Sequence, residues 1–395
     1  MPAFTEVEKE TSLPATKTYS PTRESIDEML KRPESVITFA AGPTKLPRSV
    51  KEQVIHDILD LDDTGIGILE FSHRSKKFTK IMNDATAKLR SMLKIPLNYH
   101  ILYLQGGATG QFSGIPMNLF GKSKNNPPRA DYLVTGTWSA KAFKEAQPYG
   151  EIREICARVK NYNALPDPKT FQFDPQADYF LFCDNETVHG LEYNEDTMPQ
   201  PPEGVPIVCD MSSNFLSRPI DVSKYGIIFA GAQKNLGAPG VTIVIVRDDL
   251  LDQNMPTCPG ILNYKHQVNA DSLYNTGPTF KYVVRLALIP HSIYLTLEIC
   301  KWAETLGNMD QIDALCKQRS KAVYDVIDNS SGFYRGHVEV VSHRSRVNVV
   351  LKCPTEELDQ KWQNEARDRG LVNLNGHRSI GGLRISMYNA MTLEE

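Results

Sequence analysis

Short apolar runs recur along the first two thirds of the chain, and amphipathic stretches separate the earlier ones. Several runs are continuous rather than alternating, which is typical of strands that are covered by helices on both faces of a sheet. The runs are 100–104 "HILYL", 131–135 "DYLVT", 179–183 "YFLFC", 206–209 "PIVC", 227–230 "IIFA" and 241–246 "VTIVIV". Helical patterns lie at 76–93 and 109–120. This order predicts a mainly parallel α/β sheet.

The pattern changes after residue 280. Two long helical stretches, about 281–305 and 310–328, precede short strand-like runs and one more helical pattern. These later elements are expected at 338–341, 346–351, 382–386 (strands) and 355–369 (helix). We therefore expect a large domain over 36–280, whose first residues are candidates for packing with a smaller α+β domain over 281–395. Residues 1–35, rich in Thr, Ser, Pro and charges, are predicted to form a loosely ordered extension with one short helix over "ESIDEMLKR".

Composition narrows the class of protein. The net charge of −3 over 395 residues, with no long basic run, argues against nucleic acid or an anionic membrane as a partner. No segment approaches the ~20 apolar residues of a membrane span. The first 35 residues lack the apolar region of a secretory signal and are too acidic for a transit peptide. Seven cysteines include no Cys-x-x-Cys pair, and we expect Cys183 and Cys209 to be buried free thiols in a cytoplasmic protein.

Chemically useful side chains follow the predicted strands, where ligands bind in open α/β sheets. The five segments are "QGGATGQF", "GTWSAKAF", "DNETVHG", "DMSSNF" and "GAQKNLG". They offer a glycine-rich turn before a helix, a tryptophan, a threonine, an aspartate and a lysine. Pyridoxal 5′-phosphate needs this set, because its aldehyde requires a lysine, its ring nitrogen an acid, its ring a stacking face and its phosphate a helix N-terminus.

Each of these features has an ordinary explanation when it is taken alone. The glycines could form a simple tight turn, Asp210 could cap a helix, and Lys234 could be a solvated loop residue. Trp138 could pack at a domain surface. The prediction of a cofactor site depends on their joint arrival at successive strand ends.

The chain resembles the phosphoserine aminotransferases, which are fold-type I pyridoxal-phosphate enzymes, over about residues 36–395. The matching stretches are "FAAGPTKLP", "EFSHRSKKF", "LQGGATGQFSGIPMNL", "VTGTWSAKA", "NETVHG", "CDMSSNFLSRPIDVSKYGIIFAGAQKN", "YNTGPTF" and "GHRSIGGLRISMYNA". Several of them are long and specific to this family. The resemblance implies a large domain with a mainly parallel sheet of the seven-stranded type and a smaller α+β domain.

The resemblance also implies roles for the residues at the strand ends. Lys234 would form the internal aldimine, and a partly desolvated site would lower its pKa and free the amine. Asp210 would pair with the pyridinium nitrogen, Trp138 would stack on the ring, and Thr187 would hydrogen-bond the ring oxygen.

A phosphate site is implied by a further set of residues. Ala108 and Thr109, at the start of a helix, would bind the cofactor phosphate together with Gln233. In the family, the residues that match Asn275 and Thr276 reach that phosphate from the other subunit. The active site would therefore require a homodimer.

The family's anion-binding residues match Arg74 in "SHR", His377 and Arg378 in "GHR", and Arg384 in "GGLR". The implied reaction moves an amino group between glutamate and 3-phosphohydroxypyruvate, giving 2-oxoglutarate and O-phospho-L-serine in L-serine biosynthesis. Asn375 stands where lysine is usual in the family. The family also continues past "YNA" into a closing helix, which the small domain is expected to lack.

Two other functions stay open at this point. One is a different fold-type I reaction, such as that of a related aminotransferase or of a cysteine desulfurase, although no cysteine lies in a recognisable catalytic loop of the desulfurase kind. The other is a catalytically silent dimer that keeps the fold as a binding module. The presence of Lys234 and Asp210 argues against the second.

Overall fold

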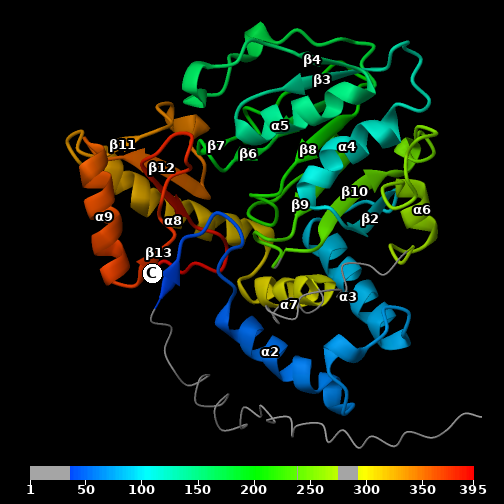
Figure 1. Cartoon of the computed structure of the whole chain (residues 1–395), viewed down its shortest axis with the longest axis horizontal. Helices are drawn as coiled ribbons and strands as arrows, with labels where there is room; N and C mark the ends of the chain where they lie inside the picture. The colour runs from blue at the N-terminus through cyan, green and yellow to red at the C-terminus, as the bar shows by residue number, and fades with distance from the viewer. Residues whose placement is uncertain (1–35, 238, 275–291) are drawn as a thin grey trace, which may run out of the picture. The chain divides into compact units, whose positions relative to one another are not determined.

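A seven-stranded sheet forms the centre of the computed structural model, which describes residues 36–237, 239–274 and 292–395 (Figure 1). Its strands, in spatial order, are β2 (Tyr99–Leu104), β10 (Thr242–Arg247), β9 (Ile227–Gly231), β8 (Ile207–Asp210), β5 (Tyr179–Cys183), β3 (Arg129–Leu133) and β4 (Glu151–Glu154). Only β10 runs antiparallel to its neighbours. The predicted mainly parallel α/β fold is confirmed, and the six strands predicted for the first two thirds of the chain lie within two residues of their expected bounds.

Helices cover both faces of this sheet (Figure 1). On one face lie α4 (Gly107–Leu119) and α5 (Thr137–Ala146), and on the other lie α3 (Lys76–Met92) and α7 (Ser292–Thr305). Strand β10 shows the consequence, because Ile243 and Ile245 pack into the core on the α3 side while Val244 and Val246 pack into the core on the α4 side. Because both faces are covered, the central strands β5 and β9 are buried and apolar along their whole length.

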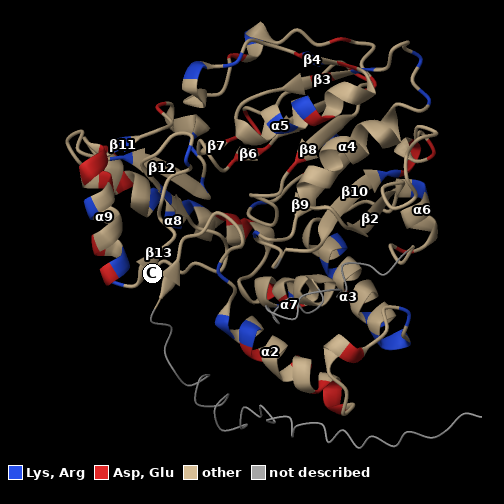
Figure 2. Ribbon diagram, viewed as in Figure 1, with Lys and Arg blue, Asp and Glu red and all other residues tan. Residues whose placement is uncertain are grey.

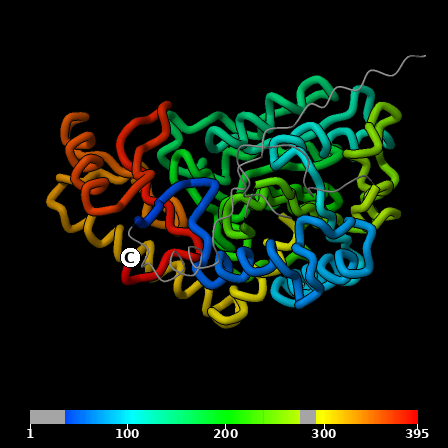
Figure 3. The backbone as a smooth tube through the Cα atoms, turned by 60° about the horizontal axis from the view of Figure 1, so that its bottom comes forward, coloured from blue at the N-terminus to red at the C-terminus, as the bar shows by residue number. Residues whose placement is uncertain are grey.

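A second, three-stranded antiparallel sheet comes from the last part of the chain. Its order is β11 (Arg335–Gly336), β12 (Asn348–Lys352) and β14 (Leu383–Ser386). Helices α8 (Met309–Asp328) and α9 (Glu356–Asp368) accompany it. Early in the chain, β1 (Ile37–Thr38) pairs in parallel with β13 (Leu371–Val372), so residues far apart in sequence lie together (Figure 3). The division into domains at residue 280 stays a prediction.

Among the described residues, the remaining α-helices are α2 (Arg48–Leu59) and α6 (Tyr264–Asn269), and the remaining strands are the antiparallel pair β6 (Asn185–Glu186) and β7 (Leu191–Glu192). Charged residues gather on outer helices such as α2 and α9, whereas β9 carries none (Figure 2). All seven cysteines are free, and Cys183 and Cys209 are buried as expected. Among the described residues, no helix is long and apolar enough to cross a membrane.

One predicted strand, 338–341, is wrong. The chain is irregular there and enters a short 3₁₀ helix at Val341–His343, while the strand lies earlier, at β11. Val338 is buried, but Val340 and Val341 are exposed. The alternating apolar pattern at 338–341 therefore comes from one buried side chain, Val338, and does not mark the face of a strand. Strand β4 was not predicted, because its sequence "EIRE" is that of a polar edge strand. The predicted helix over "ESIDEMLKR" and residues 281–291 lie outside the described residues.

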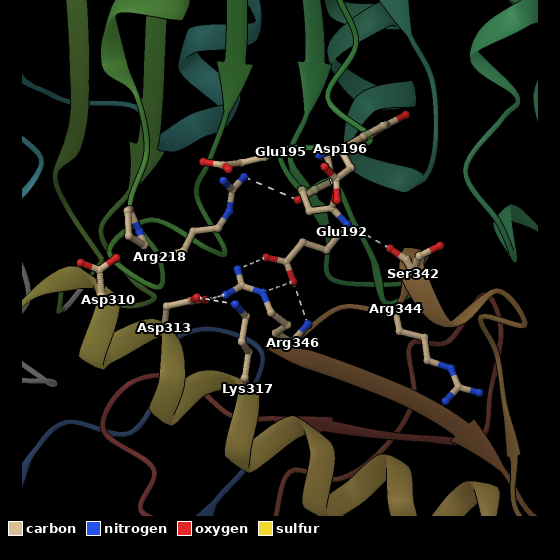
Figure 4. Close-up of a pocket in the computed structure, with 13 residues that line it drawn as sticks. Glu192, Glu195, Asp196, Arg218, Asp310, Asp313, Lys317, Ser342, Arg344 and Arg346 are labelled. Carbon is tan, nitrogen blue, oxygen red and sulfur yellow. Dashed lines mark hydrogen bonds and ion pairs between the residues drawn. The ribbon is translucent and has the colours of Figure 1, made fainter.

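Buried ion pairs join the segment that follows β5, including β7, to later parts of the chain. Arg346 donates from Nη2 to Oε1 of Glu192 at 2.5 Å and from its backbone N–H to Oε2 at 2.7 Å, and it also pairs with Asp313 (Figure 4). Arg218 donates to Asp184 at 2.7 Å. Except for Asp184, these residues line a charged cavity of about 500 Å³. Its lining includes none of the predicted site residues. We therefore treat the ion pairs around it as structural contacts.

The Glu192–Arg346 ion pair allows a prediction of how stability changes when one of its two partners is replaced. Burial disfavours the Glu192 carboxylate, but Arg346 and Arg218 outweigh burial and lower its pKa. Glu192→Gln leaves Arg346 buried with a weaker partner and should cost about 3 kcal/mol of unfolding free energy. The matched control is Glu365→Gln, because that side chain is exposed and lies 3.9 Å from Lys361. The control should change stability by about 0.5 kcal/mol or less.

The pH dependence follows from the direction of the shift. A carboxylate whose pKa is depressed by folding stabilises the protein above its unfolded pKa, and this contribution disappears as pH falls through the folded pKa. The difference between wild type and Glu192→Gln in urea unfolding should therefore be full at pH 7 and should shrink below pH 4.5. An equal difference at pH 7 and pH 3 would contradict the ion-pair account.

Candidate active site

The parallel pairing of β5, β8 and β9 brings three chain segments to one edge of the sheet. Cys183 at the end of β5 pairs with Asp210 at the end of β8, and Asp210 pairs with Phe229 of β9. Lys234 follows the end of β9 by three residues. Asp210 and Lys234 therefore lie at the carboxyl edge of the sheet, where α/β proteins bind ligands.

Lys234 is held in a tight, buried bend. Only 8% of the residue is exposed. Thr44 donates from Oγ1 to the Lys234 carbonyl at 3.1 Å, and the bend closes with Gly237 and Gly240 at φ of +130°, a conformation that favours glycine. Burial lowers the pKa of Lys234 to about 8, and the nearby Asp210 carboxylate opposes this shift. The amine is therefore much more often neutral than that of an exposed lysine.

Asp210 is 5% exposed, and its Oδ1 accepts hydrogen bonds from the Ser212 N–H at 2.9 Å and the Ser212 hydroxyl at 2.6 Å. The same hydroxyl accepts from the Gly231 N–H at 3.0 Å, which ties the Asp210 turn to the end of β9. Burial raises the pKa of Asp210, whereas the Ser212 hydrogen bonds and Lys234 lower it. An incoming cation would relieve this desolvation.

Trp138, Thr187 and Arg384 form one connected group beside Lys234. The indole Nε1 of Trp138 donates to Oγ1 of Thr187 at 2.8 Å. The Lys234 Nζ lies 5.8 Å from the centroid of the Trp138 ring. Nη1 of Arg384 donates to the Thr187 carbonyl at 3.3 Å, and burial lowers the pKa of Arg384. The buried Nε of Arg384 has no acceptor among the residues that the structure describes, so this guanidinium still has a donor for an anion.

The glycine-rich turn opens α4 as expected, although the helix begins at Gly107 rather than at residue 109. Gly106 and Gly107 have φ of +94° and +64°. Ala108 and Thr109 therefore occupy the first turn, whose N–H groups have no partner inside the helix. Because β2 runs in the same direction as β9, this helix start lies at the same sheet edge as Lys234. Gln233 is half-buried next to Lys234.

Among the described residues, the other predicted anion-binding residues form no hydrogen bond with the group formed by Lys234, Trp138, Thr187 and Arg384. Nδ1 of His377 and the Ser379 hydroxyl share a hydrogen bond of 2.7 Å. Burial, together with the charges of Arg384 and Arg378, lowers the pKa of His377. Arg378 and Arg74 are exposed, and Arg74 lies just before α3. Within the described ranges, no hydrogen bond joins the side chain of either arginine to Lys234 or Arg384. Asn275 and Thr276 lie outside the described residues.

Two residues that form hydrogen bonds to the residues of this site were not identified from the sequence. Ser212 fixes Asp210, and Glu186 accepts hydrogen bonds from the first turn of α5. Ser212 could have been found, because a serine two residues after an aspartate commonly bonds back to it. Glu186 could not, since its partners are 47 and 48 residues away.

The comparisons with known proteins agree with this geometry. The family model described as aminotransferase class-V matches residues 36–395. A Drosophila melanogaster protein named phosphoserine aminotransferase is 44% identical over 364 residues, which cover 91% of this chain and 95% of the relative. A Laribacter hongkongensis protein of the same name is 43% identical and covers 91% and 95%.

Solved structures give the same result. Phosphoserine aminotransferase from Bacillus circulans subsp. alkalophilus has a TM-score of 0.83 at 39% identity, covering 90% of this chain and 94% of that one. The pyridoxal-phosphate-bound enzyme from Trichomonas vaginalis has a TM-score of 0.82 at 37% identity, covering 91% and 97%. A chain with this sheet, this lysine bend and these near-full-length relatives belongs to the class-V aminotransferases and, within them, to the phosphoserine aminotransferase family.

Proposed function

We propose that the protein is a phosphoserine aminotransferase that uses pyridoxal 5′-phosphate to move an amino group between glutamate and 3-phosphohydroxypyruvate, in L-serine biosynthesis. The observation that carries this proposal is Lys234, a buried amine with a pKa lowered to about 8 beside the Asp210 carboxylate and the Trp138 ring. An aminotransferase needs a neutral lysine at this place. The near-full-length relatives support the choice of substrate.

The residues present fit this cofactor. Lys234 would hold it covalently, Asp210 would face its ring nitrogen, and Trp138 and Thr187 would contact its ring. The free N–H groups of Ala108 and Thr109, with Gln233, would bind its phosphate. When bound, pyridoxal phosphate supplies an electron sink for the bonds at the substrate Cα.

The protein's own contribution to the chemistry is proton transfer and charge placement. Within each half-reaction, Nζ of Lys234 would move one proton between the substrate Cα and the C4′ position of the cofactor, as a general base and then a general acid. A pKa near 8 suits both roles near neutral pH. The Ser212 hydrogen bonds keep Asp210 oriented, so its charge stays in place through both half-reactions.

Substrate selection is assigned to the cationic residues. Arg384 would hold the α-carboxylate that all four substrates share, because its buried Nε is a free donor among the described residues. Arg74, His377 and Arg378 would hold the distal anion, which is phosphate in phosphoserine and a carboxylate in glutamate. Asn375, exposed near this group, makes the site less positive than one with the usual lysine.

We also propose a cytoplasmic homodimer. The match of "YNTGPTF" to the family assigns Asn275 and Thr276 to the phosphate site of the partner subunit. Seven free cysteines suit a reducing compartment.

Lys234→Ala should abolish turnover and prevent borohydride from fixing the cofactor to the chain. Lys141→Ala is the matched control, because Lys141 also lies over the Trp138 ring, at 5.3 Å, but is exposed. In wild type, covalent capture of added pyridoxal phosphate should accelerate as pH rises towards 8, since about a tenth of the amine is neutral at pH 7. Mass spectrometry of reduced protein decides the case, and label on Lys234→Ala protein would refute the assignment.

Arg384→Ala should slow both half-reactions, and Arg378→Ala should slow the phosphoserine half more than the glutamate half. The reason is that a phosphate dianion gains more than a carboxylate from each positive group. A lost charge-assisted hydrogen bond reduces kcat/KM roughly ten- to a hundredfold. Single-turnover kinetics with each amino donor measure both effects. Equal losses for the two donors in Arg378→Ala would remove Arg378 from the phosphate site.

Mixing two inactive chains tests the shared site. One chain carries Lys234→Ala, and the other carries substitutions at both Asn275 and Thr276. A mixed dimer should contain one site free of both defects, so activity should return to about a quarter of wild type at random exchange. Native mass spectrometry establishes the exchange. Inactive mixed dimers would show that each subunit builds its own phosphate site.

A further inference from the structure

Glu186 is a buried carboxylate that binds the start of α5. It is 1% exposed, and it lies at the end of β6, against which α5 packs (Figure 1). Oε1 accepts from the Ser139 N–H at 2.8 Å and from the Ser139 hydroxyl at 2.7 Å, and Oε2 accepts from the Trp138 N–H at 3.0 Å. Both oxygens are therefore engaged by the first turn of one helix, where free N–H groups and the helix dipole favour an anion.

The backbone around this contact is shaped for it. A Cβ at Gly136 would lie 2.4 Å from Cδ of Glu186, so only glycine permits this approach. The Ser139 hydroxyl, which donates to Glu186, accepts from the N–H groups of Thr135 and Gly136 at 2.9 and 3.1 Å. The loop that leads into α5 is thus fixed by the same carboxylate that fixes the helix start.

The same two-residue segment also holds the indole. Thr187, directly after Glu186, accepts from Nε1 of Trp138 at 2.8 Å. Trp138 is therefore attached at its backbone by one residue and at its ring edge by the next. Two attachment points on opposite sides of the side-chain torsions leave the ring plane little freedom.

We propose that Glu186 is a positioning residue that sets the plane of the Trp138 ring over the cofactor site. This inference rests on the proposed function, in which Trp138 stacks on pyridoxal phosphate. In this role Glu186 needs no contact of its own with substrate or cofactor. Its effect on the cofactor passes through the N–H of Trp138 and the start of α5.

Glu186→Gln is the sharpest test, because the amide keeps the size of the side chain but turns an NH₂ group towards one of the N–H donors. Cofactor-free protein, prepared from the holoenzyme, should bind pyridoxal 5′-phosphate about tenfold more weakly. The visible circular dichroism of the bound cofactor should also change, since it depends on the asymmetric placement of the ring beside it. Ser139→Ala removes the hydroxyl that donates to Glu186 and accepts from the N–H groups of Thr135 and Gly136, but it leaves the two backbone donors to Glu186 in place. It should therefore shift both readouts in the same direction by less.

Glu192→Gln is the matched control for the loss of a buried carboxylate, because Glu192 is 3% exposed but pairs with Arg346. It should lower stability and leave the visible circular dichroism unchanged. Should Glu186→Gln or Ser139→Ala alter only thermal stability, as Glu192→Gln does, the positioning role would be wrong. Ser139→Ala keeps this test usable if Glu186→Gln does not fold.

A double-mutant cycle separates this inference from the proposed function. Trp138→Ala should weaken cofactor binding, and Glu186→Gln should add nothing to the affinity loss in that background. Normal affinity in Trp138→Ala would refute stacking by Trp138 itself. Weak affinity in Trp138→Ala with a full further loss from Glu186→Gln would support stacking and overturn positioning.

Discussion

Parallel strand pairing is the constraint on which the site depends. Parallel strands end at the same sheet edge, so the residues that follow β5, β8 and β9 meet although they are distant in sequence. The register places Cys183 beside Asp210 and Asp210 beside Phe229. Antiparallel β10 does not deliver a group to this edge. Instead, the turn between β9 and β10 forms the bend that buries Lys234, and the Ala232 N–H donates to the Val241 carbonyl at 3.0 Å to close it.

Hydrogen bonds between buried polar side chains connect this edge to the smaller sheet. Asn185 donates to Ser213 at 2.7 Å and to Asn348 at 2.8 Å, and Asn348 donates to Ser386 at 2.9 Å. This chain of hydrogen bonds crosses from the loop after β5 to β12 and β14. A satisfied network favours a single arrangement, whereas a half-satisfied one would be costly. The Nε of Arg384 is one of several buried polar atoms that have no partner among the described residues.

Much of the fold and part of the site followed from local sequence. Strands such as β5 and β10 were predictable because burial on both faces demands continuous apolar residues. The position of Lys234 and Asp210 at one sheet edge was predictable, because Asp210 ends one buried strand and Lys234 follows another by three residues. Strand β4 and the region 338–341 were not, since an edge strand can be polar and an alternating pattern can arise from one buried valine. The role of Glu186 was out of reach for a different reason: its partners on α5 are set by packing between elements, which no local pattern encodes.

The charges of the site specify what it binds. Burial pushes both Lys234 and Asp210 towards their neutral forms, which raises the pKa of the acid and lowers that of the amine. A ligand relieves both penalties only if it offers an electrophile to the amine and a cation to the carboxylate. The N–H groups in the first turn of α4 also favour the binding of an anion at the same sheet edge. Few small molecules carry an electrophilic carbon, a protonated ring nitrogen and a phosphate on one rigid frame, and pyridoxal 5′-phosphate is one of them.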